Sequence, residues 1–133
     1  MDGITDLHEL ISSMSPTMAQ GEFVFISLPD ATYGRESHLA PIASFVEREG
    51  LTLIIPKDRA DAATVDYDET FRMITLRVHS SLCAVGLTAA VSTQLASKGI
   101  SANIVAAYFH DHIFVPSRQA EEALVELRRI GKS

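Results

Sequence analysis

The second half of the chain predicts a fixed order of strands and helices, and this order limits its fold more than any other feature. Residues 71–78 are rich in apolar and β-branched side chains and predict a strand. A helix follows, because Ser80 or Ser81 can cap its start and Gly99 suits the left-handed position that ends it near Lys98.

Two more strands and a second helix continue this order. Strands are predicted at 102–109 and 113–115, and His110-Asp111-His112 between them is too short for anything but a hairpin. Ser117 can cap a final helix that Gly131 ends. The order β, α, β, β, α is one strand short of the ferredoxin-like βαββαβ unit. We therefore expect the missing strand to come from elsewhere in the chain.

The first half supplies further elements, so we expect the two halves to share or extend each other's sheets. A short amphipathic helix is predicted near the N-terminus, from Ile4 to Met14. Strands are predicted at 22–28, 42–47 and 51–55, followed by a brief helix at 57–63. The positive φ available to Gly50 suits the hairpin between the second and third of these strands. Residues 31–41 and 66–69 are expected to be irregular surface segments.

Composition excludes several classes of function. Apolar residues make up 47% of the 133 residues and charged residues 21%, which indicates a packed globular protein. The net charge of −6, without a run of Lys and Arg, argues against nucleic acid as a partner. The apolar tract Leu82–Ala96 is interrupted by polar residues and is shorter than the roughly 20 residues that span a bilayer, so it predicts a buried helix and no membrane contact.

The cellular compartment is expected to be the cytoplasm. Acidic residues occupy the N-terminal stretch where a secretory signal would carry positive charge, which argues against export. Cys83 is the only cysteine, so no disulfide forms within the chain, and this fits a reducing compartment.

Two segments carry a resemblance to a known family. The stretch 78–91 combines the end of a strand, a loop and a helix start rich in small residues at Val85-Gly86. The stretch 95–105 combines a helix end at Gly99 with Asn103-Ile104 on the next strand. Together they resemble the ACT domain, the regulatory module of aspartate kinases and other amino-acid enzymes, over residues 71–127.

The whole chain also looks like a family of short bacterial proteins with tandem ACT-like folds, for which 49–53 and 110–115 are the most recognisable segments. This resemblance implies an α+β fold built from ferredoxin-like modules, each with an antiparallel sheet and helices on one face. It places an atypical N-terminal module at 1–68 and a C-terminal module at 69–133.

In ACT modules an amino acid typically binds at an interface between modules, on the loop after the first strand and the start of the second. Carried over to this sequence, the resemblance implies the following ligand-binding residues: His79, Ser80, Ser81, Val85, Gly86, Asn103, Ile104 and Val105. The loop departs from the aspartate-kinase pattern, because it lacks the acidic residue that can pair with a ligand's ammonium group. The ligand therefore stays open.

The residue types fit two interpretations of this segment. Amides around Ser81 to Val85 can meet a carboxylate, Gly86 allows close approach of the backbone, and Asn103 offers a donor or an acceptor. Equally, Ser80 and Ser81 can simply cap the helix, with Gly86 packing it on the sheet.

Catalysis and metal binding find less support in the sequence. His110-Asp111-His112 contains ligands of first-row metals, but a tight turn gives no assurance that they converge, and no second motif completes a closed site. Cys83 and the serines beside His79 lack a third, orienting group and are expected to be structural. No catalytic residue and no cofactor is predicted.

The sequence therefore predicts a non-catalytic regulatory protein that binds a small molecule, and an amino acid is the expected ligand, at a module or subunit interface. It is expected to form a homodimer or higher homo-oligomer and to regulate an enzyme in trans or buffer its ligand. The alternatives are a homo-oligomeric interaction module that pairs through sheet edges without a ligand, and a metal-dependent enzyme that uses His110 and His112.

Overall fold

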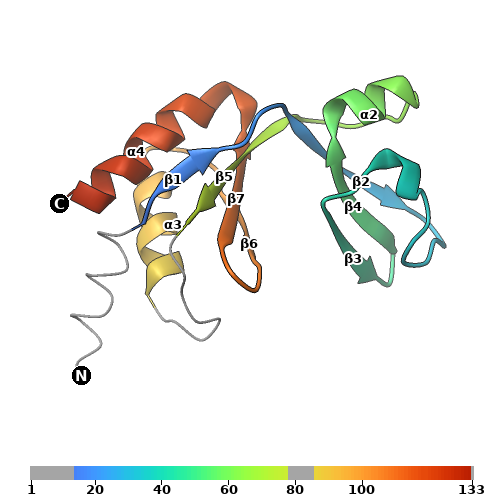
Figure 1. The fold of residues 1–133 in the computed structure, drawn as a ribbon, viewed down its shortest axis with the longest axis horizontal. Coiled ribbons are helices and arrows are strands. Elements are labelled where there is room, and N and C mark those ends of the chain that lie inside the picture. Colours follow the sequence, from blue (N-terminus) through green and yellow to red (C-terminus); the bar gives the residue numbers. More distant parts are fainter. Residues whose placement is uncertain (1–13, 78–85, 133) are drawn as a thin grey trace. The chain divides into compact units, whose positions relative to one another are not determined.

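The computed structural model of the protein describes residues 14–77 and 86–132 (Figure 1). These residues form two compact units. One is Gln20–Phe71, and the other contains Arg72–Ser133 together with the described part of Met1–Ala19. The units differ from the modules predicted at 1–68 and 69–133 in one main respect, since residues 14–19 group with the second half of the chain.

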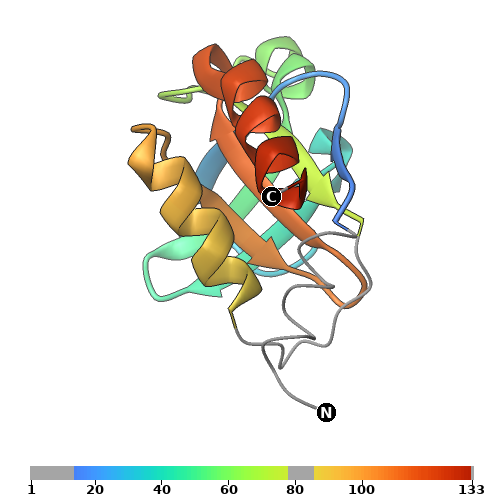
Figure 2. The same ribbon diagram turned by 90° about the vertical axis from the view of Figure 1, so that its left-hand side faces the viewer.

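The unit that contains the second half is a four-stranded sheet covered on one face by helices α3 and α4 (Figures 1 and 2). Its strand order is β1-β5-β7-β6. In chain order its elements are β1 (Pro16–Met18), β5 (Phe71–Leu76), α3 (Leu87–Ser97), β6 (Asn103–Ala106), β7 (Asp111–Pro116), the 3-10 turn η2 (Ser117–Gln119) and α4 (Ala120–Lys132).

Strand β1 is the strand that the second half lacks. It pairs antiparallel with β5, with Pro16 opposite Leu76 and Met18 opposite Ile74. With β1 in place, the order is that of a complete ferredoxin-like unit, and the expectation that the missing strand comes from elsewhere in the chain is confirmed.

One apolar core lies between this sheet and its helices. Alternate residues of β5 and β7 point to the helices, while α3 and α4 contribute the apolar stripes that face them. Buried members include Ile74, Leu76, Leu87, Val91, Leu95, Ile113, Val115, Ala123 and Leu127. A partly buried hydrogen bond also joins the helices, because Gln94 Nε2 on α3 donates to Glu126 Oε1 on α4 at 2.7 Å.

The unit Gln20–Phe71 is a smaller sheet of order β3-β4-β2, with Phe71 paired to Phe23 beside it. Its elements are β2 (Phe23–Leu28), the 3-10 turn η1 (Ser37–Leu39), β3 (Ala43–Glu47), β4 (Gly50–Pro56) and α2 (Lys57–Ala62). A loop with one 3-10 turn stands where a ferredoxin-like unit has its first helix. Leu39 of that turn is 2% exposed and fills the core with Val24, Leu51, Leu53, Ile55 and Ala60.

Most predicted elements of the described part are confirmed, with differences at their ends. Helix α3 begins at Leu87, after Gly86 with φ 102°, so the prediction that Ser80 or Ser81 caps it is wrong. The last hairpin turns at Ala107–His110, where the Ala107 amide donates to the His110 carbonyl at 3.1 Å, and Asp111 and His112 belong to β7.

Two further predictions concern the ends of the chain. Helix α4 continues to Lys132, so Gly131 does not end it. The N-terminal helix predicted at Ile4–Met14 lies, except for its last residue, outside the described residues. Among residues 14–77 and 86–132, no helix is long and apolar enough to span a lipid bilayer.

We expect Gly50→Ala to destabilise the protein strongly. Gly50 has φ 151°, and a Cβ atom there would lie 2.7 Å from the backbone carbonyl oxygen of Leu28. The combined strain and clash should lower the free energy of unfolding by about 2–5 kcal/mol in urea denaturation.

Gly34→Ala is the matched control for this substitution. Gly34 also has a positive φ, 96°, but a Cβ atom on Gly34 would have no heavy atom within 4 Å. Only the backbone cost of about 1–2 kcal/mol should remain. Equal losses in the two variants would show that the contact with Leu28 contributes nothing.

Candidate functional site

Half of the predicted ligand-binding residues lie in the described part of the chain. His79, Ser80, Ser81 and Val85 fall outside it. The remaining four are Gly86, Asn103, Ile104 and Val105, at the start of α3 and on β6.

Gly86 occupies the residue that precedes α3. Its φ of 102° is left-handed, and its carbonyl accepts a hydrogen bond from the Ala90 amide at 2.8 Å. A side chain would strain this conformation, so the glycine has a local structural reason to be here.

Strand β6 divides the other three predicted residues between two faces. Ile104 packs against the core under the helices, whereas Asn103 and Val105 point to the opposite face of the sheet. Asn103 Nδ2 donates to the Phe114 carbonyl on β7 at 3.3 Å. A ligand on the helix-free face can therefore meet Asn103 and Val105, but the Ile104 side chain is not available to it.

A row of side chains crosses the helix-free face beside Val105. Val105 is paired with His112 and Thr17 with Thr75, while Thr75 Oγ1 lies 2.9 Å from His112 Nδ1. Burial, followed by the neighbouring charge of His110, lowers the pKa of His112. The imidazole is therefore neutral at neutral pH, which suits hydrogen bonding and not charge pairing.

The metal hypothesis for His110 and His112 receives no support from the surroundings of these residues. Within 14–77 and 86–132, no group of three or more His, Cys, Asp or Glu side chains is placed to hold a metal ion.

In the unit Gln20–Phe71, a cavity of about 320 Å³ opens between the loop after β2 and the start of β3. We call it the loop cavity. Its lining residues are Tyr33, Gly34, Arg35, Ser37, Pro41, Ile42, Ala43, Ser44 and Leu53. Arg35 is the only charged side chain among these nine, so the cavity lining combines one positive charge with hydroxyl groups and apolar side chains.

The backbone of this loop is strained. Glu36 and Ala40 both have left-handed conformations, with φ of 60° and 55°, although neither is glycine. Such residues cost about 1–3 kcal/mol each and cluster at ligand clamps and switch segments. One hydrogen bond connects this loop to α2, because Arg59 Nη1 donates to the His38 carbonyl at 2.8 Å.

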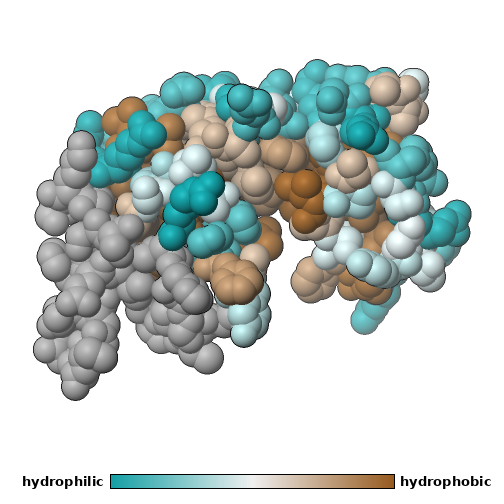
Figure 3. Space-filling view, in the orientation of Figure 1, coloured by the Kyte–Doolittle hydropathy of each residue, from teal (hydrophilic) through white to brown (hydrophobic). Residues whose placement is uncertain are grey.

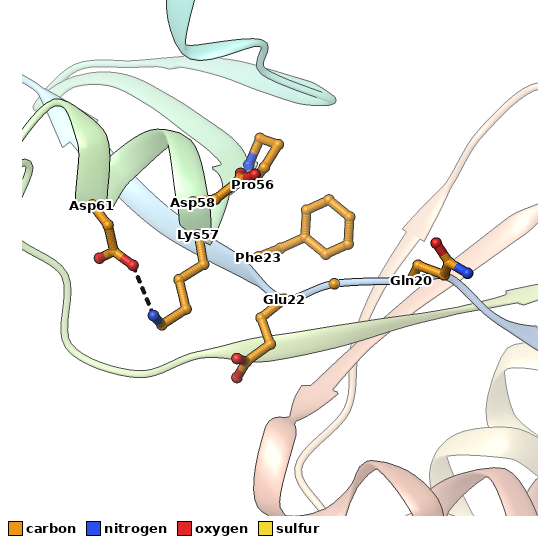
Figure 4. A pocket seen from close by; sticks show the side chains of 8 residues that line it. Gln20, Glu22, Phe23, Pro56, Lys57, Asp58 and Asp61 are labelled. Carbon is orange, nitrogen blue, oxygen red and sulfur yellow. Dashed lines mark hydrogen bonds and ion pairs between the residues drawn. The ribbon is translucent and has the colours of Figure 1, made fainter.

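A second cavity, of about 390 Å³, lies where β2 begins and α2 starts (Figure 4). Phe23 and Pro56 form its apolar wall, and Lys57 and Asp61 lie on its polar side with their charged groups 2.7 Å apart. Tyr67 also donates to Asp61, at 2.8 Å. The hydrogen bonds from Lys57 and Tyr67 lower the pKa of Asp61, and the bond to Asp61 raises the pKa of Lys57. These groups satisfy one another without a ligand.

A third cavity, of about 480 Å³, lies between β2 and the connector that leads to β5. Ser27 and Thr52 contribute hydroxyls, and Asp66 and Asp68 contribute carboxylates. Of the three cavities, the loop cavity alone pairs an unopposed cation with apolar walls, and it is therefore the candidate ligand site of this unit.

Residues 31–41 are predicted to be an irregular surface segment, and their residue types do not indicate this cavity. Tyr33 and Arg35 there are exposed. The available signal was the position of the segment, between the first and second strands of its own unit.

Comparison with family models divides the chain in sequence order, so that residues 14–19 fall in the first match although they group with the second half in the structure. A family model described as ACT domain matches residues 2–72, and a second model, also described as ACT domain, matches residues 68–129. The chain belongs to the ACT-domain family. It carries two such domains in tandem, and its fold class is confirmed as ferredoxin-like α+β.

Solved structures agree with this assignment. A Vibrio cholerae protein described as of unknown function and as a possible transport protein is 45% identical, with a TM-score of 0.88 over 98% of this chain and 99% of that one. An Agrobacterium tumefaciens protein is 18% identical, with a TM-score of 0.70 over 89% of each chain. No curated protein matches the sequence significantly.

The regulatory subunit of aspartate kinase from Thermus thermophilus, in its ligand-free form, shares the fold. It is 13% identical, with a TM-score of 0.60 over 89% of this chain and 98% of that one. Membership of the ACT family supports a regulatory, ligand-binding role. In the unit Gln20–Phe71, the loop after the first strand and the start of the second strand form the two walls of the loop cavity.

We expect the His112 imidazole to titrate below its ordinary pKa of 6.5, as followed by NMR. Because the pKa is lower in the folded than in the unfolded chain, the related stability is present above pH 6.5 and is lost as the pH falls through the folded value. His110→Asn should raise the pKa of His112 by removing a neighbouring cation, and Asp111→Asn should lower it. Shifts of the same sign in both variants would contradict this account.

Proposed function

We propose that this tandem ACT-domain protein binds a free amino acid and regulates another protein in trans. The loop cavity carries this proposal, because it combines a guanidinium group, hydroxyls and an apolar wall at the place where the ACT family binds its ligands. Its volume of about 320 Å³ falls in the range of small-molecule pockets.

The lining of the cavity suits the parts of an amino acid. Arg35 offers a planar, permanently charged donor for a carboxylate. The hydroxyls of Ser37 and Ser44 can accept hydrogen bonds from an ammonium group. Ile42 and Leu53 form an apolar surface for the ligand's side chain.

The strained loop gives the bound ligand a means of acting on the protein. A ligand shifts a conformational equilibrium only by its differential affinity for the two states. Left-handed Glu36 and Ala40 lie in the same loop as Arg35, so a carboxylate held by Arg35 favours one loop conformation over relaxed ones. The regulated protein would respond to that change in loop conformation.

The residues carried over to the second half remain a proposal for a second site. Of these, Asn103 and Val105 share the helix-free face with His112. The other residues that the resemblance implies, His79, Ser80, Ser81 and Val85, would complete the site. The Asn103 side chain already has one partner, the Phe114 carbonyl, and a ligand would use its remaining acceptor.

We expect thermal unfolding against the twenty amino acids to reveal a selective ligand. At 100 times its dissociation constant, a ligand adds about 2.7 kcal/mol and raises the midpoint by several degrees. Arg35→Ala should remove most of the shift because it deletes the carboxylate donor. Arg128→Ala, which removes the same charge from the exposed face of α4, should retain the shift.

The result of this scan separates the proposal from its main alternative. No shift with any amino acid would overturn the free-amino-acid proposal and favour an interaction module without a ligand. A shift that both arginine variants lose equally would show a response to net charge and not a site at Arg35.

We expect Asn103→Ala to test the second site independently. If the second half binds the same ligand, the variant should weaken the shift while the unliganded midpoint changes little, since Asn103 is exposed. Gly86→Val is unsuitable for this purpose, because the positive φ of Gly86 makes any side chain destabilising. An unchanged ligand shift in Asn103→Ala would place the site in the loop cavity alone.

A further inference from the structure

Strand β2 has one open side where the equivalent strand of the other unit has a full neighbour. In the sheet β1-β5-β7-β6, strand β5 lies between β7 and β1. In the sheet β3-β4-β2, strand β2 occupies the same place beside β4, but its other side pairs with β5 at Phe23 alone, opposite Phe71. Among the described residues, no strand continues this pairing toward Leu28.

The alternation of hydrogen bonds along β2 identifies which backbone groups face the open side. The Lys57 amide donates to the Glu22 carbonyl at 2.8 Å, and the register of β2 on β4 carries the alternation forward. Ile26 and Leu28 therefore turn their amides and carbonyls toward β4, whereas Ser27 turns its own away from β4. Open strand edges of this kind are templates for an added strand.

The third cavity, of about 480 Å³, lies along this open side of β2. We call it the edge groove. One wall is β2 itself, where Phe25 and Ile26 contribute apolar side chains. The other wall is the segment 66–68, which follows α2 and leads to β5 (Figure 1). The groove thus combines an open sheet edge with apolar surface.

The edge groove carries negative charge. Asp66 and Asp68 are exposed, and within residues 14–77 and 86–132 neither carboxylate has a hydrogen-bond or ion-pair partner. Thr52, which also lines the groove, donates from its hydroxyl to the carboxylate of Glu47. None of the described lining residues is basic. Figure 3 shows largely hydrophilic surface where Figure 1 places α2, so a partner on this side is selected by charge.

We propose that the edge groove binds an extended segment of a partner protein, rich in lysine or arginine, which adds to β2 as a further strand. The backbone of this segment exchanges hydrogen bonds with Ser27, and its cationic side chains pair with Asp66 and Asp68. In strand addition, main-chain hydrogen bonds give affinity and the side chains give specificity.

Charge favours a basic partner over a second copy of this chain. A second β2 would bring its own Asp66 and Asp68 to the same groove, and like charges brought together cost several kcal/mol. The net charge of −6 instead attracts cationic segments. The edge groove shares no lining residue with the loop cavity, so this proposal goes beyond the proposed function and does not depend on the ligand there.

A labelled peptide of alternating valine and lysine, seven residues long, tests the proposal with the full chain. Fluorescence anisotropy should show saturable binding. A peptide with proline in place of valine keeps the charge but disrupts strand pairing, and a peptide with glutamate in place of lysine reverses the charge. Both should bind at least about tenfold more weakly. No binding of the valine–lysine peptide at millimolar protein, or equal binding of the proline peptide, would overturn strand addition.

Substitution of the two carboxylates tests the place of binding. Asp66→Asn combined with Asp68→Asn should weaken binding of the valine–lysine peptide by about tenfold or more, the effect of losing charge-assisted hydrogen bonds. Circular dichroism should stay unchanged, because both residues are exposed. Glu121→Gln combined with Glu122→Gln removes the same charge from the exposed start of α4 and should bind the peptide as the wild type does. Equal losses in the two double variants would overturn the edge groove as the site.

Amide hydrogen exchange followed by NMR tests the backbone contact directly. With the valine–lysine peptide at saturation, the Ser27 amide should exchange at least about tenfold more slowly, because it gains a hydrogen bond. The Val46 amide is the internal control, since it points away from β4 on β3, the other edge of the same sheet. Its exchange rate should stay the same. An unchanged rate at Ser27, or equal slowing of both amides, would show that the peptide does not add to β2.

Discussion

The pairing of β1 with β5 is the constraint on which the rest of the fold depends. A strand of three residues supplies the position that the second half lacks, and Met14 and Met18 close one end of its core. The chain therefore leaves this unit at Ala19, forms Gln20–Phe71, and returns at Arg72. The two family matches follow the chain in sequence, whereas the compact units follow the hydrogen bonds of the sheet.

The shortened crossover in Gln20–Phe71 explains where this unit has space. A ferredoxin-like unit places a full helix between its first two strands, and that helix fills the sheet face. Here a loop and the short turn η1 take its place, and this segment gives the core one fully buried side chain, Leu39, with Ala31 packed partly against it. Because a short loop covers the sheet face in place of a helix, its backbone adopts left-handed conformations and leaves a cavity lined by Arg35. The feature that weakens packing thus creates a place for a ligand.

Position on the sheet also separates stabilising from available side chains. On β6, Ile104 belongs to the core while Asn103 and Val105 face away from the helices, so adjacent residues have different uses. On β3, the backbone amide and carbonyl of Phe45 point toward β4, whereas those of Ser44 and Val46 point away from it.

The sequence alone determined the element types, since apolar periodicity and turn residues act locally: strands β2 to β7, helix α2 and the helix ending at Gly99 were all predictable. It also indicated the ACT family through small residues and glycines with fixed backbone roles. Tertiary structure decided the rest. No local pattern shows that Pro16–Met18 pairs with residues about sixty positions away, because that pairing depends on an open sheet edge. The loop cavity likewise joins Arg35 to Leu53, and only the register of β3 on β4 brings these distant residues together.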